Sequence, residues 1–469
     1  MPEHPTIGYL GADVLGDAEL RHEAGGLIAA EVPLEVVSAH CLAPPSFRDD
    51  RESEEVANGI EHLYPLGISR STREAIAASS VFGKRFWKLI HQIGFRRGDE
   101  NRRGLRWLFR LPGALRLAML WRDKRVGHIH AHGPAEIAEI AMHAAKLLEI
   151  GFSFTERTGY AFDNRYAKYA VEREGVLSLA RGARFIVCGS EYKRRQYLEM
   201  GIAPQRLPVV YQGIDVRRCG PSIDSVFNGG ETSGNAPSSP SVILTAGCLR
   251  EESGFHDLIT AFALLRDRGA RFQCVVTGSG PRESKLRKQT LRLELQDRVT
   301  VTGMSVLAQG LPRLLAGATM LVQPYLERQS AGLAELPQVL LESMLRGVPV
   351  ISTRSAGIPD LVRDRQTGLL VEPHNVSALA DAIGELLSDK ELRSRLAAEA
   401  KPWTAANFNR ELAIDRLEEL FITAAWTPGN SPPRTYMNSA PNALSQYGKA
   451  FQPTEKERLP QEMAMLEPR

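Results

Sequence analysis

The sequence has few cysteines, no long apolar run and almost no net charge. Its cysteines, Cys41, Cys188, Cys219, Cys248 and Cys274, are widely spaced and odd in number, which suits neither a disulfide framework nor a zinc site and favours a reducing cytoplasm. No apolar run approaches the roughly 18 residues that span a bilayer, and the first residues lack the pattern of a signal peptide. A net charge of +3 on 469 residues gives no reason to expect a nucleic-acid partner. We therefore expect neither secretion nor a membrane span.

Length and composition predict two domains and a tail. A chain of 469 residues exceeds what one hydrophobic core usually serves. Between Pro221 and Ser241 the residues are mostly Gly, Ser, Pro and Asn, as in a linker. The predicted parts are an N-terminal domain at 1–218, a linker at 219–240, a C-terminal domain at 241–400, a C-terminal helix at 401–426 that could return to the N-terminal domain, and a disordered tail at 427–469.

Short apolar runs alternate with longer amphipathic stretches in both halves. The N-terminal half holds TIGYL, LEVVSA, HIHAH, GFSFT, ARFIVCGS and LPVVYQG, and the C-terminal half holds SVILTAG, RFQCVVTG, DRVTVTG, ATMLVQPY and VPVISTR. Strands separated by helical segments of this length predict an α/β fold with a parallel sheet in each domain. In open sheets of this kind, ligands bind beyond the carboxyl ends of the strands.

The most informative segment is residues 333–371, LAELPQVLLESMLRGVPVISTRSAGIPDLVRDRQTGLLV. Pro337 suits the first position of a helix, and the QVLLESML that follows repeats apolar residues at helical spacing. The start of such a helix exposes unpaired N–H groups and the positive end of the helix dipole, which attract a phosphate. Glu342 lies between one and two turns inside, where its carboxylate could accept hydrogen bonds from the hydroxyls of a ribose.

This segment resembles the hallmark of glycosyltransferase family 4, or group 1, particularly the branch that acts in exopolysaccharide and colanic acid assembly. The family reads roughly EGLPNVLLEAMACGLPVI, then GIPELV and TGLLV, and the chain matches many of these positions in order. Further similar stretches are the glycine-rich CVVTGSGPRESKLRK, the opening GDAELRHEAGGL with Glu23, and VVYQGID with Gly213. The resemblance implies a GT-B fold, in which two Rossmann-like domains face each other across a cleft.

The resemblance also implies a reaction: retaining transfer of a sugar from a nucleotide-diphosphate sugar to a glycan or lipid-linked acceptor in surface polysaccharide biosynthesis. No Asp-x-Asp triplet occurs in the chain, as in the metal-independent mode of GT-B enzymes, so we expect no metal and no cofactor besides the donor substrate. The positions that the motifs assign to the nucleotide sugar are Gly278, Gly280, Leu336, Pro337, Gln338, Val339, Leu340 and Glu342.

The chain departs from the family at its usual catalytic positions. Counting back from Glu342, the glutamate that touches the transferred sugar falls on Ala334. The arginine and lysine that usually neutralise the diphosphate are replaced by Cys248 and Ser253. Three nearby residues could take over these roles and are our candidate catalytic residues: Glu335, Arg157 and Arg250.

These substitutions keep a second interpretation open, a catalytically impaired GT-B homologue that binds a sugar nucleotide or acts as a scaffold in an assembly complex. Arg157 illustrates the choice, since it stands where the resembled family has a histidine. It is either a substituted anion contact or a surface charge.

His128, His130 and His132 alternate along a strand-like HIHAH and would share one face of that strand. Such spacing suits a metal site, but the resembled family has the same run without a metal. We therefore predict no metal, and we expect His132, at the end of the strand, to line the acceptor cleft.

Residues 82–125 combine many Lys and Arg with Phe82, Phe86, Trp87 and Trp121. A helix of this composition can lie on anionic lipid with its rings among the headgroups. The protein would then be either an enzyme that works at the membrane or a membrane-surface scaffold. Alternatively, its rings cover the sheet while the charges reach water. No nucleic-acid-binding module accompanies the charge. We expect a cytoplasmic protein, which on the first interpretation works at the inner face of the cell membrane.

Overall fold

The structure is a computed structural model, and it describes residues 6–12, 14, 17–39, 60–64, 68–94, 101–156, 173–219, 241–303, 310–326 and 336–425. The tail predicted at 427–469 and all but the first residue of the linker predicted at 219–240 lie outside these residues. Within the described part of the chain, no helix has both the length and the apolar character to cross a bilayer.

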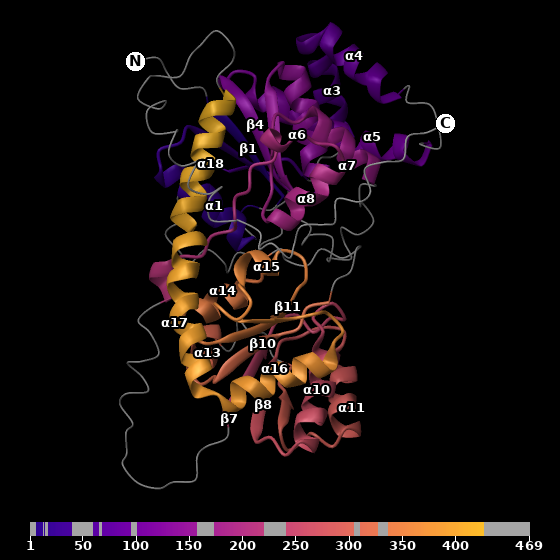
Figure 1. The fold of residues 1–469 in the computed structure, drawn as a ribbon. Coiled ribbons are helices and arrows are strands. Elements are labelled where there is room, and N and C mark those ends of the chain that lie inside the picture. The colour runs from indigo at the N-terminus through magenta and orange to yellow at the C-terminus, as the bar shows by residue number, and fades with distance from the viewer. Residues whose placement is uncertain are drawn as a thin grey trace, which may run out of the picture.

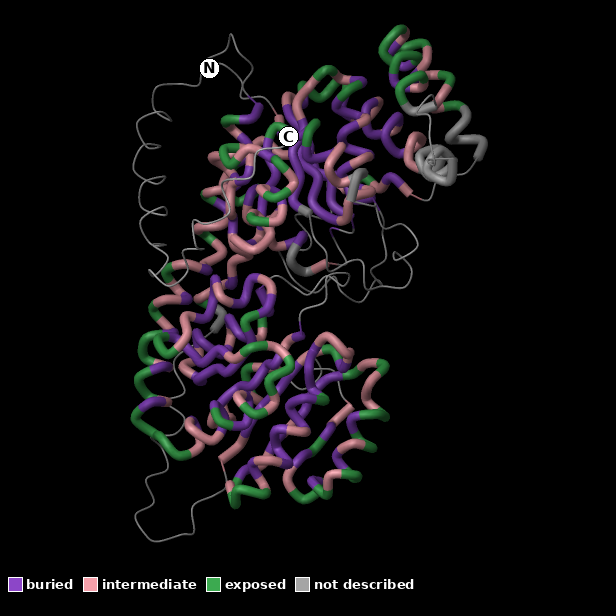
Figure 2. Tube along the Cα trace, turned by 45° about the vertical axis from the view of Figure 1, so that its right-hand side comes forward, coloured by how far each residue is buried: buried purple, intermediate pink, exposed green. Residues whose placement is uncertain are grey.

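The first sheet has six parallel strands in the order β3-β2-β1-β4-β5-β6. They are β1 (Thr6–Gly11), β2 (Leu34–Ser38), β3 (Glu61–His62), β4 (Val126–Gly133), β5 (Gly151–Glu156) and β6 (Ile186–Val187). The surrounding helices are α1 (Ala18–Ala29), α3 (Ile68–Phe82), α4 (Lys84–Gly94), α5 (Asn101–Trp121), α6 (Ala135–Leu148), α7 (Arg173–Gly182) and α8 (Glu191–Glu199). Because helices cover both faces, the central strands are buried nearly throughout (Figure 2).

The second sheet repeats this plan in the order β12-β11-β10-β7-β8-β9, again with parallel strands. They are β7 (Ser241–Ala246), β8 (Phe272–Thr277), β9 (Val299–Val301), β10 (Met320–Gln323), β11 (Val350–Thr353) and β12 (Leu369–Val371). One face packs on α10 (Phe255–Asp267), α11 (Glu283–Arg292) and α16 (Val376–Ser388). The other face packs on α13 (Leu311–Ala316), α14 (Gln338–Leu345), α15 (Ile358–Leu361) and α17 (Lys390–Asn407).

The prediction of two parallel, helix-covered sheets is therefore confirmed. Most predicted strands are present, but the apolar run LPVVYQG forms only an isolated bridge between Val209 and Cys188. Two short edge strands were not predicted, β3 and β12. Strand β3 consists of the two polar residues Glu61 and His62, so it has no apolar run to signal it.

The C-terminal helices join the two sheets. The helix predicted at 401–426 is in fact two helices, because α17 continues past residue 400 and α18 (Arg410–Ala425) begins after a short break. At this break Ile214 N donates to Phe408 O (2.8 Å) and Arg410 N donates to Ile214 O (3.1 Å). The chain passes between the two sheets twice, once near Gly213 and once near Arg410. A Cβ atom on Gly213 would overlap the backbone of Arg410, so these two segments can lie this close only because residue 213 is glycine.

Helix α18 lies against the first sheet, beside α1 (Figure 1). Ile414, Leu417 and Phe421 belong to the same buried cluster as Ile7 and Tyr9 of β1. The Phe421 ring centroid is 4.6 Å from that of His130 on β4. The last helix of the chain therefore completes the core of the first sheet.

Shortening Phe421 should loosen this attachment. Phe421 is fully buried, so we expect Phe421→Ala to destabilise the protein by about 3–5 kcal/mol through lost burial and the cavity that remains. Thr423→Ala, an exposed position on the same helix, is the matched control. Calorimetry of the full chain measures both variants, and equal unfolding midpoints would contradict this role of α18.

Candidate functional site

The carboxyl edge of the second sheet is formed by loops that are hydrogen-bonded to one another. Leu249 N, after β7, donates to Ser279 O (3.0 Å), after β8. Gly278 and Gly280 have φ values of +146° and +159°, and a Cβ atom on either would overlap the backbone of the β7 loop. The predicted glycine-rich turn is thus required by the close approach of two loops.

Helix α14 begins at this edge, after β10. Its N-cap is Pro337, with no side-chain capping bond. The amides of Gln338 and Val339 have no hydrogen-bond partner among the described residues, whereas Leu340 N donates to Pro337 O (3.0 Å). Leu336 and Leu340 are buried in the core and fix the helix in place. The start of α14 therefore offers two free N–H groups and a positive dipole end.

Glu342 lies half-buried on α14, one turn beyond these amides. Burial raises the pKa of its carboxyl group, and the nearby Arg346 guanidinium opposes this shift. No hydrogen bond to the Glu342 side chain exists within the described part of the chain. Its carboxylate is free to accept hydrogen bonds from a ligand.

The loop after β7 holds the replaced cationic positions. The hydroxyl of Ser253 donates to Cys248 O (2.6 Å), and Ser253 is buried. Arg250 Nε lies 3.1 Å from Cys248 Sγ, and Arg250 lines a pocket between α10 and α11. Arg250 thus projects among the basic side chains of α11. The other two candidate catalytic residues, Glu335 and Arg157, lie outside the described residues.

On the first sheet, a polar cluster forms where β1 and β4 end. Tyr9 donates its hydroxyl hydrogen to Glu23 Oε1 (2.8 Å), and His132 Nδ1 lies 2.7 Å from the same oxygen. His132 is almost completely buried, and its Nε2 has no partner among the described residues. Glu23 holds Nδ1, so Nε2 is left as the ring nitrogen available to another group.

The remaining histidines of HIHAH have internal partners. His130 Nδ1 lies 2.8 Å from Ser153 Oγ, and His130 Nε2 lies 3.1 Å from Thr155 Oγ1. Burial lowers the pKa of His130, and burial lowers the pKa of His128 to about 3, so both rings are neutral at neutral pH. Glu23, His130 and His132 do place ligand atoms within 4.8 Å of one another, but the hydroxyl contacts on both His130 nitrogens favour a structural role for that ring.

One direct contact between the two halves involves Asp360 of α15. Its Oδ2 accepts a hydrogen bond from Glu191 N at the start of α8 (2.6 Å). Burial raises the pKa of Asp360 to about 6, and the nearby Glu191 carboxylate adds to the shift. Sequence reasoning missed this contact, because Asp360 appeared only as part of the GIPDLV match.

Two models of known protein families match the chain. The family model "Glycosyltransferase Family 4" matches residues 38–218, and "Glycosyl transferases group 1" matches residues 231–403. The chain belongs to the family 4, group 1 glycosyltransferases. The resemblance seen in the motifs is thereby confirmed for both halves.

Among curated relatives, this family 4 member is 33% identical to alpha-D-kanosaminyltransferase of Streptomyces kanamyceticus over 38% of the chain and 45% of the relative. It is 28% identical to the putative colanic acid biosynthesis glycosyltransferase WcaL of Salmonella typhimurium over 48% of the chain and 53% of the relative. The chain therefore spans about half the length of these relatives.

Solved structures support the fold. A glycosyltransferase from Rickettsia africae superimposes with a TM-score of 0.62 at 17% identity, covering 92% of this chain and all of the other. Anabaena HepE in complex with UDP and glucose gives a TM-score of 0.61 at 17% identity, covering 90% of this chain and 100% of the other. The GT-B fold expected of this family 4 member is confirmed.

The contact of Asp360 with α8 predicts a dependence of stability on pH. The pKa of Asp360 is raised from 3.8 to about 6, so between these values the folded protein binds a proton that the unfolded chain has released. Stability contributed by this group is therefore lost as pH rises through that window. Asp360→Asn keeps an acceptor for Glu191 N and removes the charge, so it should raise the free energy of unfolding at pH 7.5 by roughly 1–2 kcal/mol.

Urea unfolding at pH 7.5 and 4.5 tests this prediction. The gain from Asp360→Asn should shrink at the lower pH, where the wild-type carboxyl group is itself mostly protonated. Asp381→Asn, an exposed position on α16, should show no such change. A gain that is equal at both pH values would contradict the prediction.

Proposed function

We propose that this protein transfers a sugar from a nucleotide-diphosphate sugar to a glycan or lipid-linked acceptor in surface polysaccharide biosynthesis, with retention of the anomeric configuration. The single observation that carries the proposal is the start of α14, where the amides of Gln338 and Val339 and, one turn on, the carboxylate of Glu342 have no hydrogen-bond partner among the described residues. Phosphate oxygens would accept from the amides, and ribose hydroxyls would donate to Glu342. Relatives named as glycosyltransferases, and HepE bound to UDP and glucose, support this choice.

The proposed chemistry relies on the helix rather than on side-chain cations. As the bond between the sugar and the diphosphate breaks, negative charge grows on the leaving group. The positive end of α14 is fixed in place before the reaction and stabilises that charge without reorganisation. Residues Cys248 and Ser253 provide no cation there, so the amides of α14 carry more of this task than in the resembled family.

The first sheet would supply the acceptor side. There His132, whose Nδ1 is held by Glu23, would turn its Nε2 toward an acceptor hydroxyl. Closure of the two halves would then exclude water from the transferred sugar. This model needs no metal and no cofactor besides the donor substrate.

Glu342→Ala should weaken donor binding. Loss of a hydrogen bond to a charged group costs about 1.5–3 kcal/mol, so we expect roughly 10- to 100-fold weaker binding. A thermal-shift screen of the full chain with a panel of sugar nucleotides identifies the donor, and titration calorimetry then compares Glu342→Ala with Glu399→Ala, an exposed glutamate on α17. Equal weakening in both variants, or no stabilisation by any sugar nucleotide at millimolar concentration, would contradict the proposal.

The replaced cations favour a second candidate function, a catalytically impaired homologue that binds the sugar nucleotide as a scaffold. Cys248 and Ser253 are the specific observation, since Ser253 is turned onto the loop backbone. Donor turnover separates the two candidates. Release of nucleoside diphosphate that depends on Glu342 supports the transferase, whereas tight binding without release or transfer supports the scaffold.

We also propose that the protein works in the cytoplasm and that α4 contacts the inner face of the membrane. Phe82, Phe86 and Trp121 are buried, so these rings cover the sheet, but Trp87 is 63% exposed. The exposed Lys84 and Lys88 flank it on the same short helix. An exposed indole beside ammonium groups suits an interface with anionic headgroups.

Trp87→Ala should reduce binding to vesicles that contain anionic phospholipid. Loss of one buried ring at the interface should weaken partitioning by roughly tenfold, which sedimentation with the vesicles measures. The matched control is Leu291→Ala, an equally exposed apolar residue on the second half of the chain. If both variants sediment like the wild type, α4 does not contact lipid.

A further inference from the structure

A cavity of about 370 Å³ lies between α10 and α11. This is the size of pockets that hold small molecules. It is lined by Arg250, Glu251, His256, Arg282, Lys285, Leu286, Lys288, Gln289 and Arg292. We call it the α10–α11 pocket.

The charge of the α10–α11 pocket is strongly positive. Its only acid, Glu251, is paired with Arg282. Lys285, Lys288 and Arg292 have no acidic partner among the residues that the structure describes. Because they follow one another at helical spacing, they share the side of α11 that faces the cavity.

The excess of positive charge is confined to the side of α11 that faces the pocket, as Arg287 on another side of the helix shows. Arg287 pairs with Glu283, one turn away (3.0 Å), and does not line the pocket. An ordinary solvated helix surface carries charges of both signs, as the side of α11 with Glu283 and Arg287 does. The pocket side instead leaves several cations close together, which is unfavourable unless an anion joins them.

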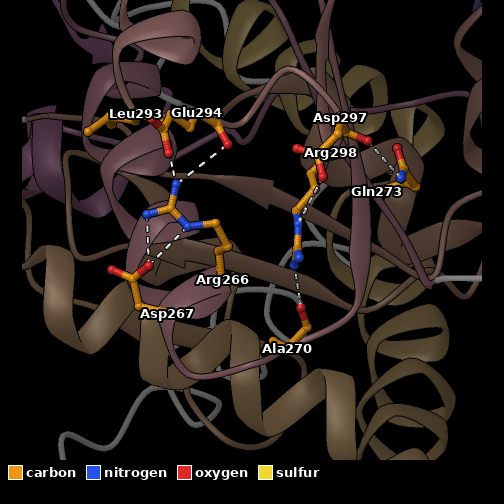
Figure 3. Close-up of polar contacts among 8 residues, drawn as sticks. All are labelled: Arg266, Asp267, Ala270, Gln273, Leu293, Glu294, Asp297 and Arg298. Carbon is orange, nitrogen blue, oxygen red and sulfur yellow. Dashed lines mark hydrogen bonds and ion pairs between the residues drawn. The ribbon is translucent and has the colours of Figure 1, made fainter.

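The walls of the pocket are held by polar contacts at both ends. Near the pocket, Gln289 Nε2 donates to His256 O (2.8 Å) and to Thr260 Oγ1 (3.0 Å). At the far end, Arg266 of α10 donates to Leu293 O, the carbonyl that follows the last residue of α11, and its other nitrogens are held by Asp267 (Figure 3).

The strands below these helices are tied in the same region. Arg298, before β9, donates to Ala270 O (2.7 Å), and Gln273 donates to Asp297 O (3.1 Å) (Figure 3). The spacing of α10 and α11 is therefore set by the protein itself, and a ligand would find the pocket already formed.

The α10–α11 pocket is separate from the start of α14. Helices α10 and α11 pack on one face of the second sheet, and α14 packs on the other. Arg250, the cation nearest to the replaced position Cys248, belongs to the pocket. A donor held at α14 leaves Lys288 and Arg292, well along α11, without an anionic partner.

We propose that the α10–α11 pocket binds a soluble anion that carries at least two phosphate groups, at a site distinct from the donor site. Guanidinium and ammonium groups are the usual partners of phosphate. Since five basic side chains surround one acid, a single phosphate would leave much of the positive charge uncompensated.

Titration calorimetry of the full chain with inorganic pyrophosphate, at constant ionic strength, tests the proposal. The variant Lys285→Ser, Lys288→Ser, Arg292→Ser should bind pyrophosphate about tenfold more weakly or worse, because each exposed cation contributes up to about 1 kcal/mol. The control Arg287→Ser, Arg313→Ser, Lys390→Ser removes the same charge from exposed positions outside the pocket and should bind like the wild type. Circular dichroism confirms that both variants fold.

Three outcomes would overturn the proposal. The first is a wild type that shows no heat of binding for pyrophosphate, and the second is equal weakening of binding in both triple variants, which would reduce the effect to net charge. The third outcome is pyrophosphate binding by the pocket variant with the affinity and stoichiometry of the wild type, which would place the anion elsewhere, such as at the start of α14. Anionic vesicles form a separate arm of the experiment: sedimentation that depends on the pocket residues without pyrophosphate binding would assign this surface to lipid headgroups instead.

Discussion

The packing of α18 on the first sheet is the constraint on which the rest of the structure depends. This helix follows α17, which packs on the second sheet, yet its apolar residues Ile414, Leu417 and Phe421 complete the core around β1. The two halves are thus connected twice, and the crossings are hydrogen-bonded side by side at Ile214 and Arg410. Both connections between the halves therefore lie together in one short region. In the proposed transfer, such a shared connection would let the halves close on a donor bound to one of them and an acceptor bound to the other.

Burial by α18 also determines the chemistry of the first edge. With Phe421 against its ring, His130 is fully enclosed and neutral, and its nitrogens are occupied by hydroxyl groups. His132, at the end of the same strand, instead has a carboxylate on one nitrogen and no partner on the other among the described residues. Alternate residues of one strand therefore have different environments, because His130 meets Phe421 and the hydroxyl groups of β5, whereas His132 meets the Glu23 carboxylate of α1.

Much of this architecture could be predicted from the sequence, because regular apolar runs predict strands and the PQVLLESML segment predicts α14 with its start at Pro337. Glycine-rich matches were informative for a reason visible only in the structure: Gly278 and Gly280 permit two loops to touch. The contact of Asp360 with α8 and the pocket beside Arg250 were not predictable. Both bring together residues that are far apart in the sequence, and the local pattern of apolar and polar residues does not show which helices will lie next to each other. The split between α17 and α18 was missed because the helical pattern continues through Asn407 and Arg410.

The two anion-attracting regions of the second half differ in their physics. At α14 the attraction comes from backbone amides and a helix dipole beside a buried core, where screening by salt is weak. At the α10–α11 pocket it comes from exposed side-chain cations, whose interactions are largely screened beyond about 10 Å at moderate ionic strength. Replacement of the family's arginine and lysine by Cys248 and Ser253 removed charge from the first region, while Arg250 adds charge to the second. If both proposals hold, donor binding at α14 would depend on geometry and little on salt, whereas anion binding at the α10–α11 pocket would weaken as ionic strength rises.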